Sequence, residues 1–192
     1  YFTRPRHSQR HTIGILMDPA LGRVIARWRE GDRDAFEEVV DRYGLQLLRT
    51  AQLILRDEAL AEDAIQDTFL KAWQRIGSLR DEDPGSWLTR IAMNESISTY
   101  RRRNRFQALT ERFGRLGGAK PELSSEARLD LAQALDRLTA EQRAAIALHY
   151  YRDLSVEESA RILKMPVDTM KSRLKTALRL LRELTGSEEA FA

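Results

Sequence analysis

The chain contains no cysteine, so disulfides, thiolate zinc sites and thiol redox switches are excluded. It also lacks an apolar run of about eighteen residues, the length that a membrane-spanning helix requires. The N-terminus has none of the ordered basic, apolar and small-residue segments of a secretory signal. We therefore expect a soluble, cytoplasmic protein without membrane insertion.

Histidine is scarce as well, with three residues in the chain. His7 and His11 are close in the sequence but have no third ligand and no helical setting, and His149 has no nucleophile beside it. The carboxylates lie on faces that we expect to be solvated. The sequence thus predicts no metal site, no cofactor and no catalysis.

The charges are unevenly distributed, although the formal net charge is only +3 and the isoelectric point is about 9.4. Residues 57–67 carry five carboxylates and no base, whereas residues 101–115 carry six arginines against Glu111. This asymmetry indicates one acidic face and one basic segment suited to phosphate.

Glycine and proline fall almost entirely at breaks between helical patterns, and no segment alternates with period two for long. We therefore expect an all-α fold with two helical domains joined by a flexible linker. Residues 1–17 are either a disordered arm or residues that precede a natural start at Met17. The expected division is a first domain at 18–105, a linker at 106–127, a second domain at 128–186 and a tail at 187–192.

Residues 58–76 of the first domain have the apolar spacing of a core-facing helix, with Phe69 and Trp73 in the buried stripe. The opposite face carries carboxylates and amides around one apolar residue, Leu70. A solvated face explains the charges, and a docking patch for a basic helix explains the leucine. The face consists of Glu62, Asp63, Gln66, Asp67, Leu70, Lys71 and Gln74.

Residues 85–104 form a second predicted helix, for which Ser86 is the expected N-cap. Trp87, Leu88, Ile91 and Ala92 form its buried stripe. Its C-terminal end is basic, and cations there complement the helix dipole. However, the density of Arg101, Arg102, Arg103 and Arg105 exceeds what a cap requires and is typical of contact with a polyanion.

The second domain has the pattern helix, turn, helix. Thr139 is expected to cap one helix, Ser155 and Glu158 to form the capping box of a short helix, and Asp168 to cap a longer one after a turn at 164–166. An ordinary helical hairpin would have the same pattern, but the polar and basic outer side of the last helix favours DNA binding in the major groove. That outer side carries Thr169, Lys171, Ser172, Arg173, Lys175, Thr176 and Arg179.

These motifs together resemble the sigma-70 family of RNA polymerase sigma factors, in particular the extracytoplasmic-function (ECF) group. The resemblance covers about residues 20–184. It is carried by AEDAIQDTFLKAW (61–73), SWLTRIAMN (86–94) with the basic run after it, and LSVEESARILKMPVDTMKSRLKTAL (154–178). The sequence departs from the family pattern at Ser98, Lys164 and Thr176, and in the loop LRDEDPGS before Trp87.

The resemblance implies a promoter-specificity subunit without catalysis that binds core RNA polymerase at the β′ clamp helices and the β flap. The polymerase-binding residues it implies are Asp63, Gln66, Asp67, Leu70 and Gln74. Promoter DNA would be bound at the −10 element by Ser86, Asn94, Ser98, Arg101, Arg102, Arg103 and Arg105. At the −35 element it would be bound by Thr169, Lys171, Ser172, Arg173, Lys175, Thr176 and Arg179.

The family resemblance also makes an anti-sigma factor an expected partner. One alternative class is a free-standing helix-turn-helix transcription regulator, which would not need the acidic face of residues 58–76. That face is therefore the feature that distinguishes the two classes.

Overall fold

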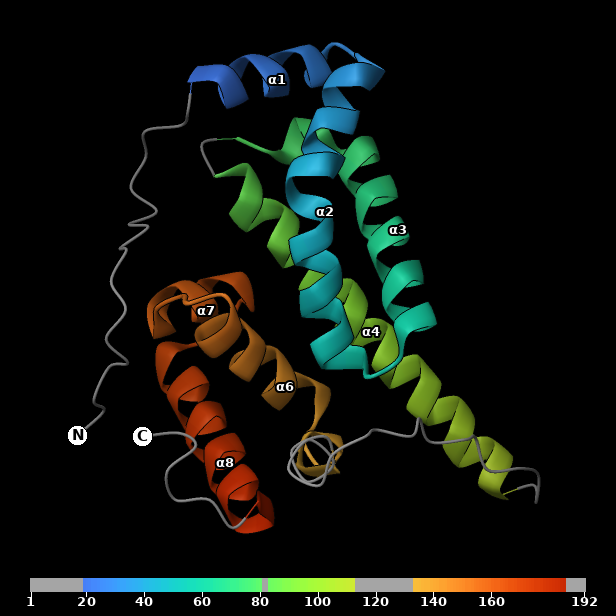
Figure 1. Ribbon diagram of the computed structural model, residues 1–192, viewed down its shortest axis with the longest axis vertical. Coiled ribbons are helices and arrows are strands. Elements are labelled where there is room, and N and C mark those ends of the chain that lie inside the picture. Colours follow the sequence, from blue (N-terminus) through green and yellow to red (C-terminus); the bar gives the residue numbers. More distant parts are fainter. Residues whose placement is uncertain (1–18, 81–82, 113–132, 186–192) are drawn as a thin grey trace.

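Helices form most of the chain that the computed structural model describes, namely residues 19–80, 83–112 and 133–185 (Figure 1). No strand occurs in these ranges, and the predicted all-α fold is confirmed. The first set of helices is α1 (Pro19–Arg29), α2 (Arg33–Leu55), α3 (Glu58–Arg75), the 3₁₀ helix η1 (Ile76–Ser78) and α4 (Pro84–Arg112). The second set is α6 (Ala140–Ile146), the π-helical segment η2 (Ala147–Tyr151), α7 (Val156–Ile162) and α8 (Val167–Thr185).

The proposed arm at 1–17 and tail at 187–192 lie outside the described residues, as do His7 and His11. The proposed linker at 106–127 lies partly inside them. Residues 106–112 continue α4 as a helix, so the helical part of the first domain is longer than the sequence indicated.

The first domain is built around an aromatic cluster between α1, α2, α3 and α4. The Trp28 ring lies 5.1 Å from that of Phe36 and 6.2 Å from that of Trp87, and Phe36 also contacts Phe69 and Trp73 at 6.1 and 5.1 Å. These edge-on and tilted contacts are the preferred geometries of aromatic pairs. Because rings from all four helices meet, the cluster fixes the positions of α3 and α4.

The ends of α2 and α3 explain the sharp turn between these helices. Arg56 adopts a left-handed backbone with φ 57°, and its N–H donates to the carbonyl of Gln52. Asp57 then caps α3 by accepting a 3.0 Å hydrogen bond from the N–H of Leu60. The two helices consequently run antiparallel and side by side (Figure 1).

The N-terminal cap of α4 differs from the prediction, which placed Ser86 there. Asp83 is the capping residue, since its Oδ2 accepts a 2.7 Å hydrogen bond from the N–H of Ser86. Pro84 is the first helical residue, a position that suits proline because the helix needs no N–H there. Ser86 lies in the first turn instead.

The second domain has both capping boxes that stabilise short helices. Ser155 and Glu158 form the predicted one, and Thr139 forms another with Gln142. The last helix buries Met170, Leu174, Ala177, Leu178 and Leu181, as predicted. Asp168 is not its cap, because α8 already begins at Val167 and the Asp168 side chain is 99% exposed.

The turn between α7 and α8 is a complete Schellman motif. Lys164 has φ 51°, its N–H donates to the carbonyl of Arg161, and the N–H of Met165 donates to the carbonyl of Ala160. A lysine therefore occupies a left-handed position that glycine adopts without strain.

The two domains pack against each other through α6, η2 and α7 on one side and α2 and α4 on the other. In Figure 1, α6 lies between α8 and the α2 and α4 helices. Ala140, Ala144, Leu148 and Ile162 belong to the same buried core as the first domain. The sequence did not predict this packing.

Candidate functional site

The outer face of α3 contains every residue of the predicted polymerase-binding set. Asp63, Gln66, Asp67 and Gln74 are exposed, and Leu70 among them is 56% exposed. The opposite side of the helix is packed through Ala61, Ala64, Thr68 and Ala72, which are at most 1% exposed. On the outer face itself, Lys71 pairs with Glu95 of α4. Leu70 therefore lies outside the core, on a helix whose opposite side is held in place by packing.

Leu45 on α2 is a second exposed leucine, 61% exposed, which the sequence reasoning missed. It follows Gly44, whose Cα faces the Phe69 ring of α3, and Leu70 follows Phe69. When two residues face each other across a pair of antiparallel helices, the residues that follow them in each helix point to the same side of the pair. Leu45 and Leu70 therefore lie on a common face, on the side away from α4.

The start of α4 is tightly built. A Cβ atom on Gly85 would lie 3.0 Å from the Tyr43 ring and 3.1 Å from the Asp83 carboxylate, so only glycine fits without displacement. Thr89 donates a 2.6 Å hydrogen bond to the Gly85 carbonyl. The close approach of Gly85 to Tyr43 brings this end of α4 against α2, and the Thr89 bond lies within α4 itself. Asp81 and Glu82 of the preceding loop lie outside the described residues.

Asn94 is exposed on α4, although Met93 and Ser96 beside it are fully buried. Ser98, one turn further along, is also exposed, and Ser86 is half-buried. Asn94 and Ser98 are therefore accessible from solvent, and Asn94 offers both a hydrogen-bond donor and an acceptor.

The arginines of α4 are not equivalent. Arg102 and Arg105 are exposed, whereas Arg103 lies 3.6 Å from the Asp57 carboxylate and 5.3 Å from the centre of the Tyr100 ring. Arg101 is paired with Glu141 of the second domain. Burial raises the pKa of Glu141, but its backbone hydrogen bond and the bond from Arg101 outweigh burial and lower that pKa overall.

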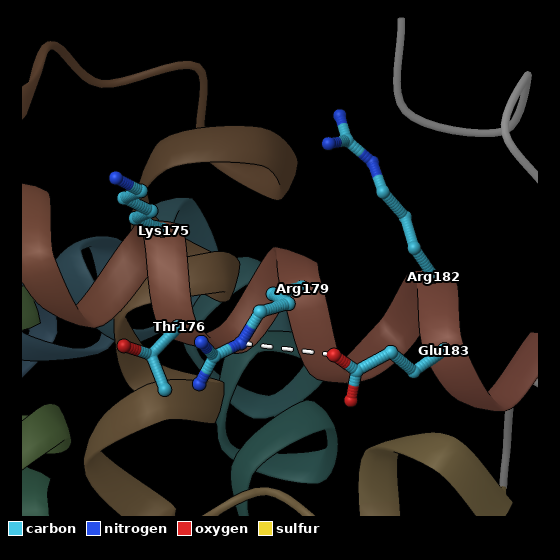
Figure 2. A pocket seen from close by; sticks show the side chains of 5 residues that line it. All are labelled: Lys175, Thr176, Arg179, Arg182 and Glu183. Carbon is cyan, nitrogen blue, oxygen red and sulfur yellow. Dashed lines mark ion pairs between the residues drawn. The ribbon is translucent and has the colours of Figure 1, made fainter.

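The predicted −35 residues lie along α8 in the expected way. Lys171, Ser172, Lys175 and Arg179 are exposed, and Thr169, Arg173 and Thr176 are half-buried. Figure 2 shows a surface pocket at the middle of this helix, lined by Lys175, Thr176, Arg179, Arg182 and Glu183. Arg179 turns toward Glu183, 3.8 Å away.

Within residues 19–80, 83–112 and 133–185, no three His, Asp or Glu side chains converge as metal ligands would. In the same ranges no helix has the length and apolarity to cross a bilayer.

An all-α, two-domain chain with an exposed acidic face, a basic helix and a helix-turn-helix defines a class of DNA-binding transcription proteins. The family models for Sigma-70 region 2 and Sigma-70 region 4 match residues 39–106 and 128–181. The chain therefore belongs to the sigma-70 family, in its ECF group. It is a sigma factor rather than a free-standing regulator.

Curated relatives and a solved structure agree with this assignment. The chain is 35% identical to the ECF RNA polymerase sigma factor SigM of Mycobacterium tuberculosis, over 85% of this chain and 83% of SigM. It is 34% identical to the sigma factor SigK of Mycobacterium ulcerans, over 85% and 90%. The sigma factor RpoE from Bartonella quintana, solved with the anti-sigma factor NepR, matches with a TM-score of 0.64 and 29% identity, over 80% and 98%.

Proposed function

We propose that the exposed face of α3 docks this sigma factor on core RNA polymerase, through the β′ clamp helices. The observation that carries this proposal is the exposure of Leu70, 56%, at the centre of an acidic face. An exposed leucine ringed by charges is a typical anchor of an interface, because its burial supplies affinity while the surrounding charges select a basic partner. Leu45 extends the apolar part of this surface onto α2.

The domain boundaries and the DNA-binding residues belong to the same proposal. The first domain, 18–105 with the helical continuation to Arg112, reads the −10 element. Asn94 and Ser98, on the exposed side of α4, would contact a base that has left the DNA stack. Ser86, in the first turn of α4, would lie at the start of this DNA-binding surface. Moving a base out of the DNA stack costs a few kcal/mol, and contacts between the base and its pocket offset this cost. The exposed Arg102 and Arg105 would bind phosphate and supply affinity without sequence information.

The second domain, 128–186, would read the −35 element by placing α8 in the major groove. Lys171, Ser172 and Lys175 are exposed on one side of that helix, as base readout requires. Arg179 and Thr176 lie near its middle, at the pocket of Figure 2, where phosphate contacts are favoured. The same domain would contact the β flap of the polymerase.

An anti-sigma factor is a further proposed partner, since the structure of RpoE with NepR pairs a related chain with such a protein. We place the protein in the cytoplasm, where polymerase and promoter DNA are found, and assign it no catalysis of its own.

In vitro transcription with core polymerase, this protein and fragmented genomic DNA tests the function directly. Mapped start sites should share two sequence elements upstream, and they should disappear when the protein is omitted. If the protein binds DNA but never associates with core polymerase, the docking proposal is wrong.

A further inference from the structure

The acidic face of α3 and the DNA-binding side of α4 meet where these two helices pack against each other. Lys71 of α3 forms an ion pair with Glu95 of α4 across that contact. Lys71 is the only basic residue between Glu58 and Gln74, and Glu95 is the only acidic residue between Pro84 and Arg105. Each member of the pair therefore has the charge opposite to that of the surface on which it lies.

Lys71 occupies the α4 side of the face proposed to dock on the polymerase. It follows Leu70 directly, Asp67 lies four residues before it, and Gln74 lies three residues after it. Residues three and four apart are neighbours on a helix surface, so the lysine is surrounded by members of the docking set. An ammonium group that pointed outward here would repel the basic partner that the carboxylates select.

Glu95 occupies the corresponding place on the DNA-binding side of α4. It follows Asn94 directly, Ser98 lies three residues after it, and Arg102 lies seven residues after it on the same side of the helix. A carboxylate without a counter-charge at this point would repel the phosphates that Arg102 is proposed to bind.

The pair is held in place by the packing of both helices. Ala72, next to Lys71, and Ser96, next to Glu95, are fully buried, and the Ser96 hydroxyl donates a 2.8 Å hydrogen bond to the Ala92 carbonyl. The Lys71 and Glu95 side chains are 36% and 17% exposed. Salt screens a partly covered pair less than a fully exposed one, so the two charges neutralise each other effectively.

We propose that Lys71 and Glu95 determine the specificity of two adjacent surfaces by acting through each other. Glu95 draws the Lys71 ammonium away from the docking face, and Lys71 neutralises the Glu95 carboxylate beside the −10 residues. The proposal rests on the docking and DNA-binding roles given above to α3 and α4. The ion pair thus allows a surface for a basic protein and a surface for a polyanion to lie side by side.

Glu95→Gln tests the first half of the proposal, because glutamine keeps the shape of glutamate and releases Lys71. Affinity for a fragment that contains only the β′ clamp helices should fall about threefold to fivefold at low salt. The loss should shrink when the salt is raised to about 0.5 M, where charges are screened within a few ångströms. Glu30→Gln is the matched control, since it removes one exposed carboxylate between α1 and α2, outside the docking face.

Lys71→Gln tests the second half, because it leaves Glu95 without a counter-charge. The probe is a single-stranded oligonucleotide that carries the −10 element found by transcription mapping. It is added to the assembled complex with core polymerase, so that differences in docking do not enter. Its affinity should fall about threefold to fivefold at low salt, and Arg137→Gln, which removes an exposed positive charge outside the proposed DNA surface, should have no such effect.

The double variant Lys71→Gln with Glu95→Gln distinguishes neutralisation from direct contact. It has neither charge, so both affinities should return to within about twofold of the native values, well inside the range of a single exposed pair. A double variant as weak in docking as Glu95→Gln, or as weak in DNA binding as Lys71→Gln, would overturn the proposal. That result would mean that the lost side chain touches the partner itself or only fixes α3 against α4.

Native affinity in either single variant would overturn the proposal as well, provided that circular dichroism shows the variant to be folded. Failure of the proposed function is a separate result. It appears when the unsubstituted protein does not bind the clamp-helix fragment and supports no transcription with core polymerase.

Discussion

Tyr100 of α4 and Arg143 of α6 form a cation–π contact of 4.3 Å between two domains. Burial raises the pKa of Tyr100, but hydrogen bonds from Asn104 and Arg143 and the nearby positive charges outweigh it, so that this pKa is lowered overall. Burial lowers the pKa of Arg143, and Tyr100 opposes that effect. The pKa of Arg143 is lowered overall, so Tyr100 offsets only part of the cost of burying the guanidinium.

Two substitutions of Arg143 separate the contribution of its packing to the free energy of unfolding from the contribution of its charge. Arg143→Ala removes the stack and leaves a cavity, so the free energy of unfolding should fall by about 1 to 3 kcal/mol. Arg143→Met keeps most of the volume and removes the donors without partners, so it should be close to neutral or stabilising. Urea unfolding followed by circular dichroism measures both. Equal losses in the two variants would show that the charge, and not the packing, supplies the stability.

Leu70→Arg should abolish docking on the polymerase while the fold is retained. Loss of a central apolar anchor costs about 2 kcal/mol or more, or about 30-fold in affinity, whereas an exposed substitution changes stability by about 0.5 kcal/mol at most. Binding to core polymerase is measured by fluorescence anisotropy. Leu184→Arg is the matched control when the same assay is run with a fragment that contains only the β′ clamp helices, since this leucine of α8 is 45% exposed and lies in the second domain, which we expect to contact the β flap instead. Leu45→Arg should weaken docking as well. Normal binding by Leu70→Arg would remove α3 from the interface.

Much of this site could be predicted from the sequence because helical period alone separates an inner from an outer face. The buried stripe of α3 and the exposed position of Leu70 follow directly from spacing. The cap of α4 could also have been found, since proline at the first helical position identifies the residue before it, Asp83, as the cap. Ser86 and Asp83 are equally good capping residues in isolation, so residue type alone does not distinguish them.

The packing between the domains could not be predicted in this way. Periodicity shows that Ala144 and Leu148 are buried, but not whether their partners lie in the same domain or in another. A charged residue such as Arg143 is expected at the surface, and nothing in the local sequence marks it as an interface residue. The exposure of Leu45 was missed for the opposite reason, since a leucine in a helical apolar pattern is normally assigned to the core.

The exposed arginines of α4 should supply affinity that depends on salt. Each phosphate contact contributes about 0.7 to 0.9 to the slope of log affinity against log salt concentration. Arg102→Ala and Arg105→Ala should each flatten that slope by about this amount, in a titration of promoter DNA between low and moderate salt. Arg137→Ala is the control, as this exposed arginine lies outside the proposed DNA surface. An unaltered slope would show that Arg102 and Arg105 do not contact phosphate.

Asn94→Ala should impair promoter opening more than nonspecific binding. The side chain is exposed and is not part of the core that Met93 beside it enters, so its removal leaves the core intact. A lost base contact costs about 1 to 3 kcal/mol, roughly tenfold to a hundredfold. Permanganate reactivity of unpaired thymines measures opening, and a filter assay with unrelated duplex measures nonspecific binding. Equal losses in the two assays would argue against base reading by Asn94.

The turn before α8 offers a stability test with its own internal control. Lys164 has φ 51°, a left-handed backbone that costs about 1 to 2 kcal/mol for a residue with a Cβ atom. Glycine removes this cost but adds freedom to the unfolded chain, so Lys164→Gly should gain up to about 1 kcal/mol, or a few degrees in Tm. Lys164→Ala keeps the Cβ atom and should gain nothing. If alanine stabilises as much as glycine, the benefit comes from removing the lysine charge, and the left-handed backbone at this turn carries no strain that glycine relieves.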